Sequence, residues 1–149
     1  MRSLAKLLAT CFCLGYIPIA PGTFGGSLLG AGIYLLISHN NVVNFIVTVA
    51  ITMIAIWSSG QAEEIFGHKD DQRIVIDETA GMLIAMLWLP DKSLLYLGLA
   101  FVVFRVMDIV KPLGIKKLQA IRGGWGVVAD DVAAGLLTNI ILRIVMKIV

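Results

Sequence analysis

The chain has 149 residues, of which 58% are hydrophobic and 15% are charged, and its net charge is +2. An ordinary soluble domain is about 45–50% apolar and about 25% charged. The composition therefore excludes a disordered chain, and the small net charge argues against nucleic acid as a partner. A membrane helix needs roughly 20 residues. We expect one all-α domain over residues 1–149, a small polytopic membrane bundle of about four or five helices with a short N-terminal interfacial helix.

The N-terminal segment carries Arg2 and Lys6 before an apolar run over residues 7–20. The run is short for a membrane span and lacks the usual small-x-small cleavage site, so it predicts an interfacial or half-inserted helix that is retained. Cys11 and Cys13 are too few for a zinc site, and we expect both to be buried apolar side chains.

Five apolar segments follow, separated by short polar breaks. They cover residues 24–38, 42–65, 79–89, 94–104 and 132–149. Backbone groups in lipid must satisfy their own hydrogen bonds, so each segment is predicted to be a helix. The two shortest segments reach a usable length only if the third begins near Ile74 and the fourth continues to the stop at Pro112.

The segments pair as two hairpins with tight turns at residues 39–41 and 90–92, and the last helix is expected to begin near Asp130. Both turns must lie on one side of the membrane. All acidic residues except Asp91, together with most Lys and Arg, then collect on the opposite side. Because an excess of Lys and Arg marks the cytoplasmic side, the polar residues are predicted at the cytoplasmic membrane face.

Two acidic pairs, Asp77-Glu78 and Asp130-Asp131, stand at the starts of predicted helices. Acidic residues favour helix N-termini, so a simple capping role stays open. Four hard oxygen donors without soft ligands nearby suit Mg²⁺ or Mn²⁺ better than zinc. Ionisable residues beside a membrane also indicate a functional site. We therefore expect these carboxylates to bind a metal ion.

Arg105, Asp108 and Lys111 recur at intervals of three residues and so share roughly one helix face. This stripe is either a surface ion-pair ladder or a pair of phosphate donors beside a metal ligand. Arg binds phosphate in a bidentate manner, and Lys acts as a point charge.

Two glycine-rich stretches, residues 21–27 and 123–126, lead into helices. Their backbone N–H groups can approach an anion, although a turn with close helix packing explains the same glycines. Carboxylates and cations beside a membrane indicate chemistry on a phosphorylated lipid. Phosphohydrolase, phosphotransferase and cation-coupled transporter all stay open at this point.

Four blocks in order give the sequence a specific resemblance to the phosphatidylglycerophosphatase A family. The blocks are residues 21–25, 69–70 with 74–81, 104–112 and 123–135, and the resemblance covers the chain from about residue 15 to its end. It implies a Mg²⁺-dependent phosphatase of the bacterial inner membrane. The substrate would be phosphatidylglycerophosphate, and the products phosphatidylglycerol and inorganic phosphate.

The resemblance also implies roles for individual residues. The metal ligands would be Asp77, Glu78, Asp130 and Asp131, and the catalytic set would add Arg105, Asp108 and Lys111. Substrate contacts would come from Pro21, Gly22, Thr23, Gly25, Lys69, Asp70, Gly123, Gly124 and Gly126.

The expected partner is a phospholipid in the membrane, and a bundle this small is a candidate for homo-oligomer formation. The sequence departs from the family pattern at Gly26 and in the loop at residues 71–73. A phospholipid phosphotransferase lacks support because its Asp-Gly-x-x-Ala-Arg signature is absent. A non-enzymatic cation-binding membrane protein is the other alternative, and it predicts charges near mid-membrane.

Overall fold

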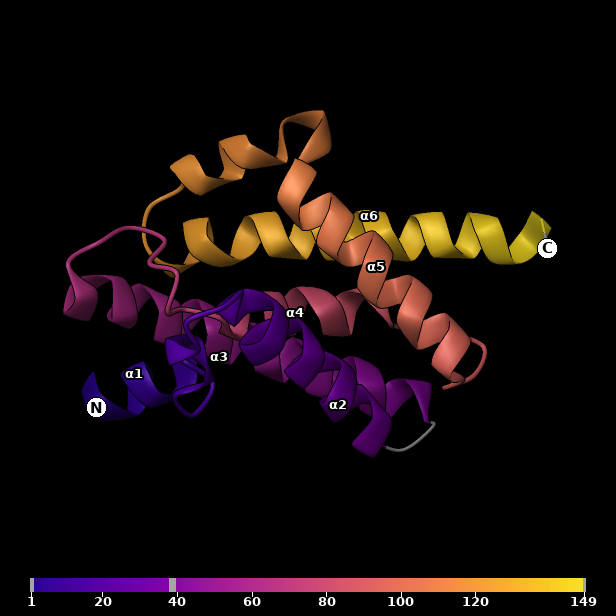
Figure 1. Ribbon diagram of the computed structural model, residues 1–149, viewed down its shortest axis with the longest axis horizontal. Coiled ribbons are helices and arrows are strands. Elements are labelled where there is room, and N and C mark those ends of the chain that lie inside the picture. The colour runs from indigo at the N-terminus through magenta and orange to yellow at the C-terminus, as the bar shows by residue number, and fades with distance from the viewer. Residues whose placement is uncertain (1, 38–39, 149) are drawn as a thin grey trace.

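The structure, a computed structural model, describes residues 2–37 and 40–148, and within these ranges the regular elements are all helical (Figure 1). The longer helices are α1 (Arg2–Ala9), α2 (Leu28–Leu36), α3 (Asn41–Phe66), α4 (Ile76–Ala85), α5 (Leu94–Val110) and α6 (Gly124–Ile148). Three shorter elements are η1 (Leu14–Tyr16), η2 (Gly22–Ser27) and η3 (Pro112–Ala120). The all-α prediction is confirmed for this part of the chain.

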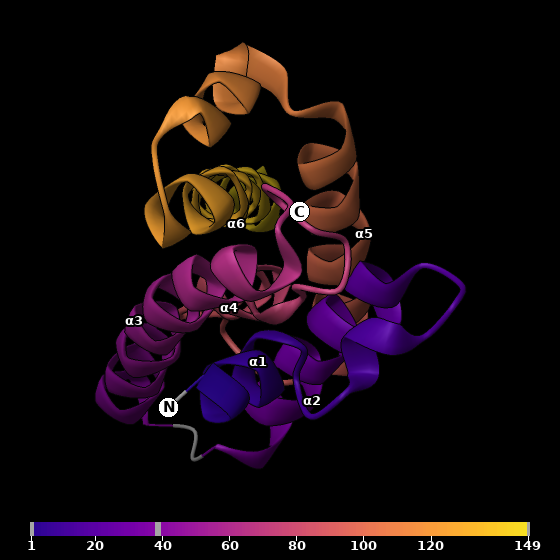
Figure 2. The same ribbon diagram turned by 90° about the vertical axis from the view of Figure 1, so that its left-hand side faces the viewer.

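Helix α4 forms the core of the bundle. Every residue of α4 except Glu78 is buried. Figure 2 shows α4 between α6 on one side and α1 and α2 on the other, and α4 also packs against α3. Ten residues at 1.5 Å each give about 15 Å, half of the roughly 30 Å hydrocarbon core of a bilayer. The predicted helix over residues 74–89 is therefore longer than the one observed, because α4 runs only from Ile76 to Ala85.

The C-terminal end of α4 is capped by a side chain from α6. The Nδ2 group of Asn139 donates to the carbonyl oxygens of Ile84, Ala85 and Leu87 at 3.4, 3.1 and 2.7 Å. The Oδ1 atom of Asn139 accepts from Nε of Arg143 at 2.8 Å. The last carbonyl groups of a helix have no partner within it, so this amide allows α4 to end inside the bundle.

Glycines bring α6 into main-chain contact with two neighbouring helices. A Cβ atom on Gly124 would lie 1.7 Å from the carbonyl oxygen of Ile56 in α3. A Cβ atom on Gly135 would lie 2.3 Å from the carbonyl oxygen of Gly81 in α4. Only glycine permits backbones to approach this closely. The position of α6 is therefore fixed at its start and again near its middle.

Among the described residues, α3 is the one helix long and apolar enough to cross a membrane, with a mean hydropathy of 2.0 in its best window. The side chain of Asn40 accepts from the N–H groups at the start of α3, and Gly67 ends the helix with φ of +70°. The first predicted hairpin corresponds to η2 with α2, followed by α3. Residue 39 of the predicted turn, like residue 38 before it, lies outside the described residues.

Two predicted boundaries are wrong. The last helix begins at Gly124 rather than near Asp130, because the glycine-rich segment is itself helical and packs on α3. The N-terminal helix is α1, which ends at Ala9, so it covers only the start of the apolar run over residues 7–20. The chain turns there because the carbonyl oxygen of Ala9 accepts the N–H of Val75 at 2.9 Å. Cys11 is buried as expected, whereas Cys13 is exposed.

Candidate active site

A cavity of about 330 Å³ opens at the N-terminal end of α4. It is lined by residues from four stretches of the chain that are separate in the sequence. These are Ala20, Pro21, Gly22, Thr23, Asp70, Asp71, Gln72, Ile74, Asp77, Glu78, Arg105, Asp108, Lys111, Asp130 and Asp131. The structure therefore brings together the two acidic pairs and the charged stripe that the sequence places at one end of the bundle.

The two acidic pairs enter the cavity from α4 and α6. Asp77 and Glu78 lie in the first turn of α4, where negative charge is favourable. Asp77 is four residues before Gly81, and Asp131 is four residues before Gly135. Four residues are about one helical turn, so each acid lies one turn before a glycine on the same helix. The contact between the two glycines thus brings the two acids to one cavity.

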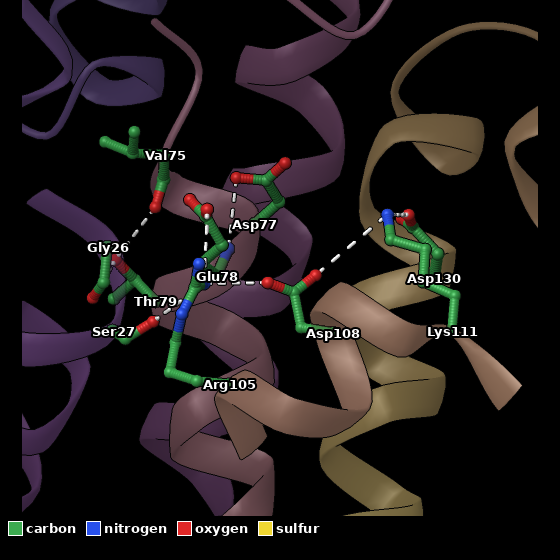
Figure 3. A network of polar contacts seen from close by, with 10 residues as sticks. All are labelled: Gly26, Ser27, Val75, Asp77, Glu78, Thr79, Arg105, Asp108, Lys111 and Asp130. Atoms are coloured by element: carbon green, nitrogen blue, oxygen red, sulfur yellow. Dashed lines mark hydrogen bonds and ion pairs between the residues drawn. The ribbon is translucent and has the colours of Figure 1, made fainter. Parts of the chain in front are cut away.

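Arg105 on α5 connects three segments around the cavity (Figure 3). Its Nη1 atom lies 2.7 Å from Oδ2 of Asp108 and 3.6 Å from Oε1 of Glu78. The same atom donates to Oγ of the buried Ser27 at 3.4 Å. The guanidinium group is therefore held between carboxylates of α4 and α5, facing the cavity that they line.

Lys111 ends α5 and crosses to α6. Its backbone has φ of +46°, a left-handed conformation that costs a non-glycine residue energy and is typical of functional sites. Its Nζ atom donates to Oδ2 of Asp130 and lies 4.0 Å from Oδ1 of Asp108. Burial lowers the pKa of Lys111, but the hydrogen bond and charge of Asp130 outweigh this and raise it. The amine is therefore a fixed positive charge at neutral pH.

Three carboxylate oxygens in the site are buried without a hydrogen-bond partner. They are Oε2 of Glu78, Oδ1 of Asp130 and Oδ1 of Asp131. A buried polar atom without a partner is costly, which points to a ligand that supplies one. Within the described ranges, no three acidic, His or Cys side chains are already grouped as a metal site. Magnesium binds through one or two carboxylates and keeps several waters, so this donor set fits it without a closed cage.

The loop before α4 contributes two further acids. Asp70 has φ of +51°, which Asp tolerates better than most residues. Burial raises the pKa of Asp70, the negative charge of Asp130 raises it further, and Lys111 opposes both. Asp71 differs, because hydrogen bonds of 2.7 Å from Nε and Nη2 of Arg73 hold its pKa below the usual value.

The first glycine-rich segment forms one wall of the cavity. Pro21, Gly22 and Thr23 line it, and a Cβ atom on Gly22 would lie 1.6 Å from Oε1 of Glu78. The N–H groups of Thr23 and its successor donate to the carbonyl oxygen of Ala20 at 3.0 and 3.1 Å. These two donors are thus used by the turn itself. Gly25 packs instead against η1 and does not line the cavity.

The remaining predicted substrate contacts lie away from the cavity. Gly124 packs on α3, and the N–H of Gly126 donates to the carbonyl oxygen of Gly123 at 2.8 Å. Lys69 donates to the carbonyl oxygen of Ile121 at 3.4 Å. The structure therefore gives these four predicted residues packing and loop contacts, and none of them lines the cavity.

Sequence reasoning missed two polar residues at the site, Ser27 and Gln119. Gln119 lies in η3, and its Nε2 atom donates to Oδ2 of Asp70 at 2.7 Å and to Oδ2 of Asp130 at 2.9 Å. A single glutamine in a polar stretch carries no pattern that could reveal this. Ser27 ends the glycine-rich stretch over residues 21–27, and this position was its one signal in the sequence.

Comparison with known proteins gives a consistent result. The family model described as Phosphatidylglycerophosphatase A matches residues 7–146. Proteins named phosphatidylglycerophosphatase A from Escherichia coli K12 and Haemophilus influenzae are 33% and 32% identical to this chain, and each alignment covers 91% of it and 80% or 85% of the relative. A Bacteroides thetaiotaomicron protein named "Putative phosphatidylinositol-3-phosphatase" is 36% identical, over 95% of this chain and 92% of its own length. No solved structure matches.

A helical chain with these relatives and with a cavity of carboxylates and cations is an enzyme, a phosphatase that hydrolyses a phosphomonoester of a lipid. It belongs to the phosphatidylglycerophosphatase A family, which confirms the resemblance seen in the sequence. The relatives and the apolar helix α3 indicate a membrane-associated protein.

Proposed function

We propose that this protein hydrolyses the terminal phosphomonoester of phosphatidylglycerophosphate to give phosphatidylglycerol and inorganic phosphate, with Mg²⁺ as cofactor. The proposed location is the bacterial inner membrane, as a multi-pass protein with its site on the cytoplasmic side. Two relatives carry the name of this activity. The excess of Lys and Arg on the side of the cavity supports the orientation.

The charge of the cavity carries the proposal. Seven carboxylates line it against two cations, Arg105 and Lys111. A phosphate monoester has a charge of about −1.5 to −2 at pH 7, so this lining would repel it. Asp77, Glu78, Asp130 and Asp131 offer the oxygen donors for a divalent cation that reverses the repulsion. When bound, that ion would neutralise phosphoryl charge and supply Lewis-acid chemistry.

The chain's own residues then act by position and charge. Arg105, oriented by Asp108, and Lys111, held by Asp130, face the cavity from α5 and compensate negative charge that develops on the phosphoryl oxygens. Asp70 lies on the loop wall, and its raised pKa suits a group that accepts a proton from water. Its Oδ2 atom is held by Gln119, so we assign the proton to Oδ1.

A second substrate class follows from the Bacteroides relative, whose name denotes a phosphoinositide 3-phosphatase. Both substrates carry a phosphomonoester on a lipid headgroup, and the same charges would bind either. The substrate preference therefore has to be measured with both lipids in parallel.

The test is phosphate release by the purified protein in detergent micelles, with and without Mg²⁺. The lipids are phosphatidylglycerophosphate, phosphatidylinositol 3-phosphate and phosphatidic acid. We expect Mg²⁺-dependent release with preference for the first lipid. Asp77→Asn and Asp130→Asn should each lower the rate at least about 100-fold. Asp91→Asn, a carboxylate at the opposite end of the bundle, is the matched control and should retain the rate.

Near-normal rates in Asp77→Asn and Asp130→Asn would refute the assignment of the site. If the enzyme prefers phosphatidylinositol 3-phosphate, the proposed substrate is wrong but the assignment of the active site stands. No release of phosphate from any of the three lipids by folded protein with Mg²⁺ would refute the proposed reaction.

A further inference from the structure

Segment η3 connects α5 to α6 and passes over the N-terminal end of α6 (Figure 2). It consists of two short 3₁₀ turns joined by a kink at Leu113 and Gly114, where φ is +58° and +78°. The buried Ile115 anchors it to the bundle. Just beyond its end, the carbonyl oxygen of Ile121 accepts from Nζ of Lys69. The segment is therefore fastened on both sides of Gln119.

Gln119 joins two walls of the cavity through a single nitrogen atom. Its Nε2 donates to Asp70 on the loop before α4 at 2.7 Å and to Asp130 on α6 at 2.9 Å. An amide NH₂ group has two N–H donors, and both are used here. Hydrogen bonds to ionised carboxylates are roughly twice as strong as those between neutral groups. The two acids are 60 positions apart in the sequence, so this contact fixes the loop relative to α6.

The same contact determines how the carboxylate of Asp130 is oriented. Its Oδ2 atom accepts from both Lys111 and Gln119, whereas its Oδ1 atom is buried without a partner. Two donors on one oxygen prevent the group from rotating and direct the other oxygen to an incoming ligand. Because the amide is neutral, it orients the acid without cancelling the negative charge that attracts a cation.

We propose that Gln119 is a positioning residue that holds Asp70 and Asp130 together and presents Oδ1 of Asp130 to a divalent cation. The role rests on the proposed function of the cavity, and it assigns to η3 a part in building the site. Substitution of a residue that hydrogen-bonds to a metal ligand typically lowers metal affinity or activity 10- to 100-fold.

The experiment compares Gln119→Met, which keeps the size and removes the donors, with Gln119→Glu, which also adds a repelling charge. Lys117→Met, an exposed position on the same segment, is the matched control. Three quantities are measured in detergent micelles: Mn²⁺ affinity without lipid from the electron paramagnetic resonance signal, kcat and KM for phosphatidylglycerophosphate, and the midpoint of thermal unfolding.

We expect Gln119→Met to weaken Mn²⁺ binding and to lower kcat about 10- to 100-fold, with KM for the lipid within twofold of the wild-type value. Gln119→Glu should weaken Mn²⁺ binding and lower kcat further, and Lys117→Met should match the wild type in all three quantities. The unfolding midpoint of Gln119→Met should fall because two hydrogen bonds to carboxylates are lost, but the variant should stay folded at the assay temperature. Wild-type Mn²⁺ affinity in Gln119→Met, or a loss of activity explained by unfolding at the assay temperature, would overturn the proposal. So would absence of Mn²⁺ binding by the wild type.

The proposed function fails separately from this proposal. If the wild type binds Mn²⁺ in a Gln119-dependent manner but releases no phosphate from any lipid, the positioning role stands and the proposed reaction does not.

Discussion

The ion pair between Lys111 and Asp130 allows a quantitative test of how the site is held together. Asp130 is 2% exposed, and the Lys111 side chain is 21% exposed. In Lys111→Met the carboxylate loses its ammonium partner but keeps the hydrogen bond from Gln119. Met and Lys are similarly strained at φ of +46°, so the backbone contribution cancels in the comparison.

Removing one partner of a buried ion pair costs about 3–5 kcal/mol, and a hydrogen bond to a charged group is worth about 1.5–3 kcal/mol. Because one such bond survives, we expect Lys111→Met to lower the free energy of unfolding by about 2–3 kcal/mol. The double variant Lys111→Met with Asp130→Asn leaves no unpaired charge. It should recover to within about 1 kcal/mol of the wild type.

Unfolding by denaturant in detergent micelles, followed by circular dichroism, measures these differences. Phosphate release from phosphatidylglycerophosphate is measured on the same samples. Stability should return in the double variant while activity stays at least about 100-fold below the wild type, because both groups belong to the site. A double variant that is less stable than Lys111→Met would refute the view that the lost charge pairing causes the destabilisation.

Two further predictions concern packing and the loop. Gly124→Ala should lower the free energy of unfolding by at least about 1–3 kcal/mol, since its Cβ would overlap the backbone of α3. Gly98→Ala in α5, where a Cβ meets nothing within 4 Å, should instead stabilise by about 0.5–1 kcal/mol; equal effects in denaturant unfolding would contradict the glycine argument. Asp71→Asn should lower the midpoint of thermal unfolding at pH 7. Because Arg73 lowers the pKa of Asp71, that difference should persist above about pH 4 and shrink as the pH falls further; a difference that grows in acid would contradict it.

The helical class and the meeting of the charged residues could be predicted from the sequence. Apolar segments with polar breaks predict helices in lipid, and the side on which Asp77, Arg105 and Asp130 gather follows from counting hairpins. The count of hairpins gives this result even though α4 is shorter than expected, because α4 still carries the chain from the cavity to the opposite end of the bundle.

The helix ends and the finer contacts could not be predicted. The end of α4 at Ala85 depends on Asn139, which lies more than 50 residues further along the chain. The role of Gln119 depends on the path of η3, in which two residues have positive φ. The glycines at positions 123–126 have the composition of an anion-binding loop, but only the approach of α3 shows that Gly124 serves helix packing. Each of these features results from tertiary contacts rather than from local pattern.

The contact between Gly81 and Gly135 has a consequence for how this protein can vary among species. One turn from that contact, Asp77 and Asp131 are separated by main-chain geometry and not by the size of neighbouring side chains. The exposed apolar residues of α3, α5 and α6 can therefore exchange among Leu, Ile, Val and Phe without changing the spacing of the two acids. Such surface substitutions leave the relative positions of Asp77 and Asp131 unchanged. A single methyl group added at Gly81 or Gly135 would instead displace the two acids.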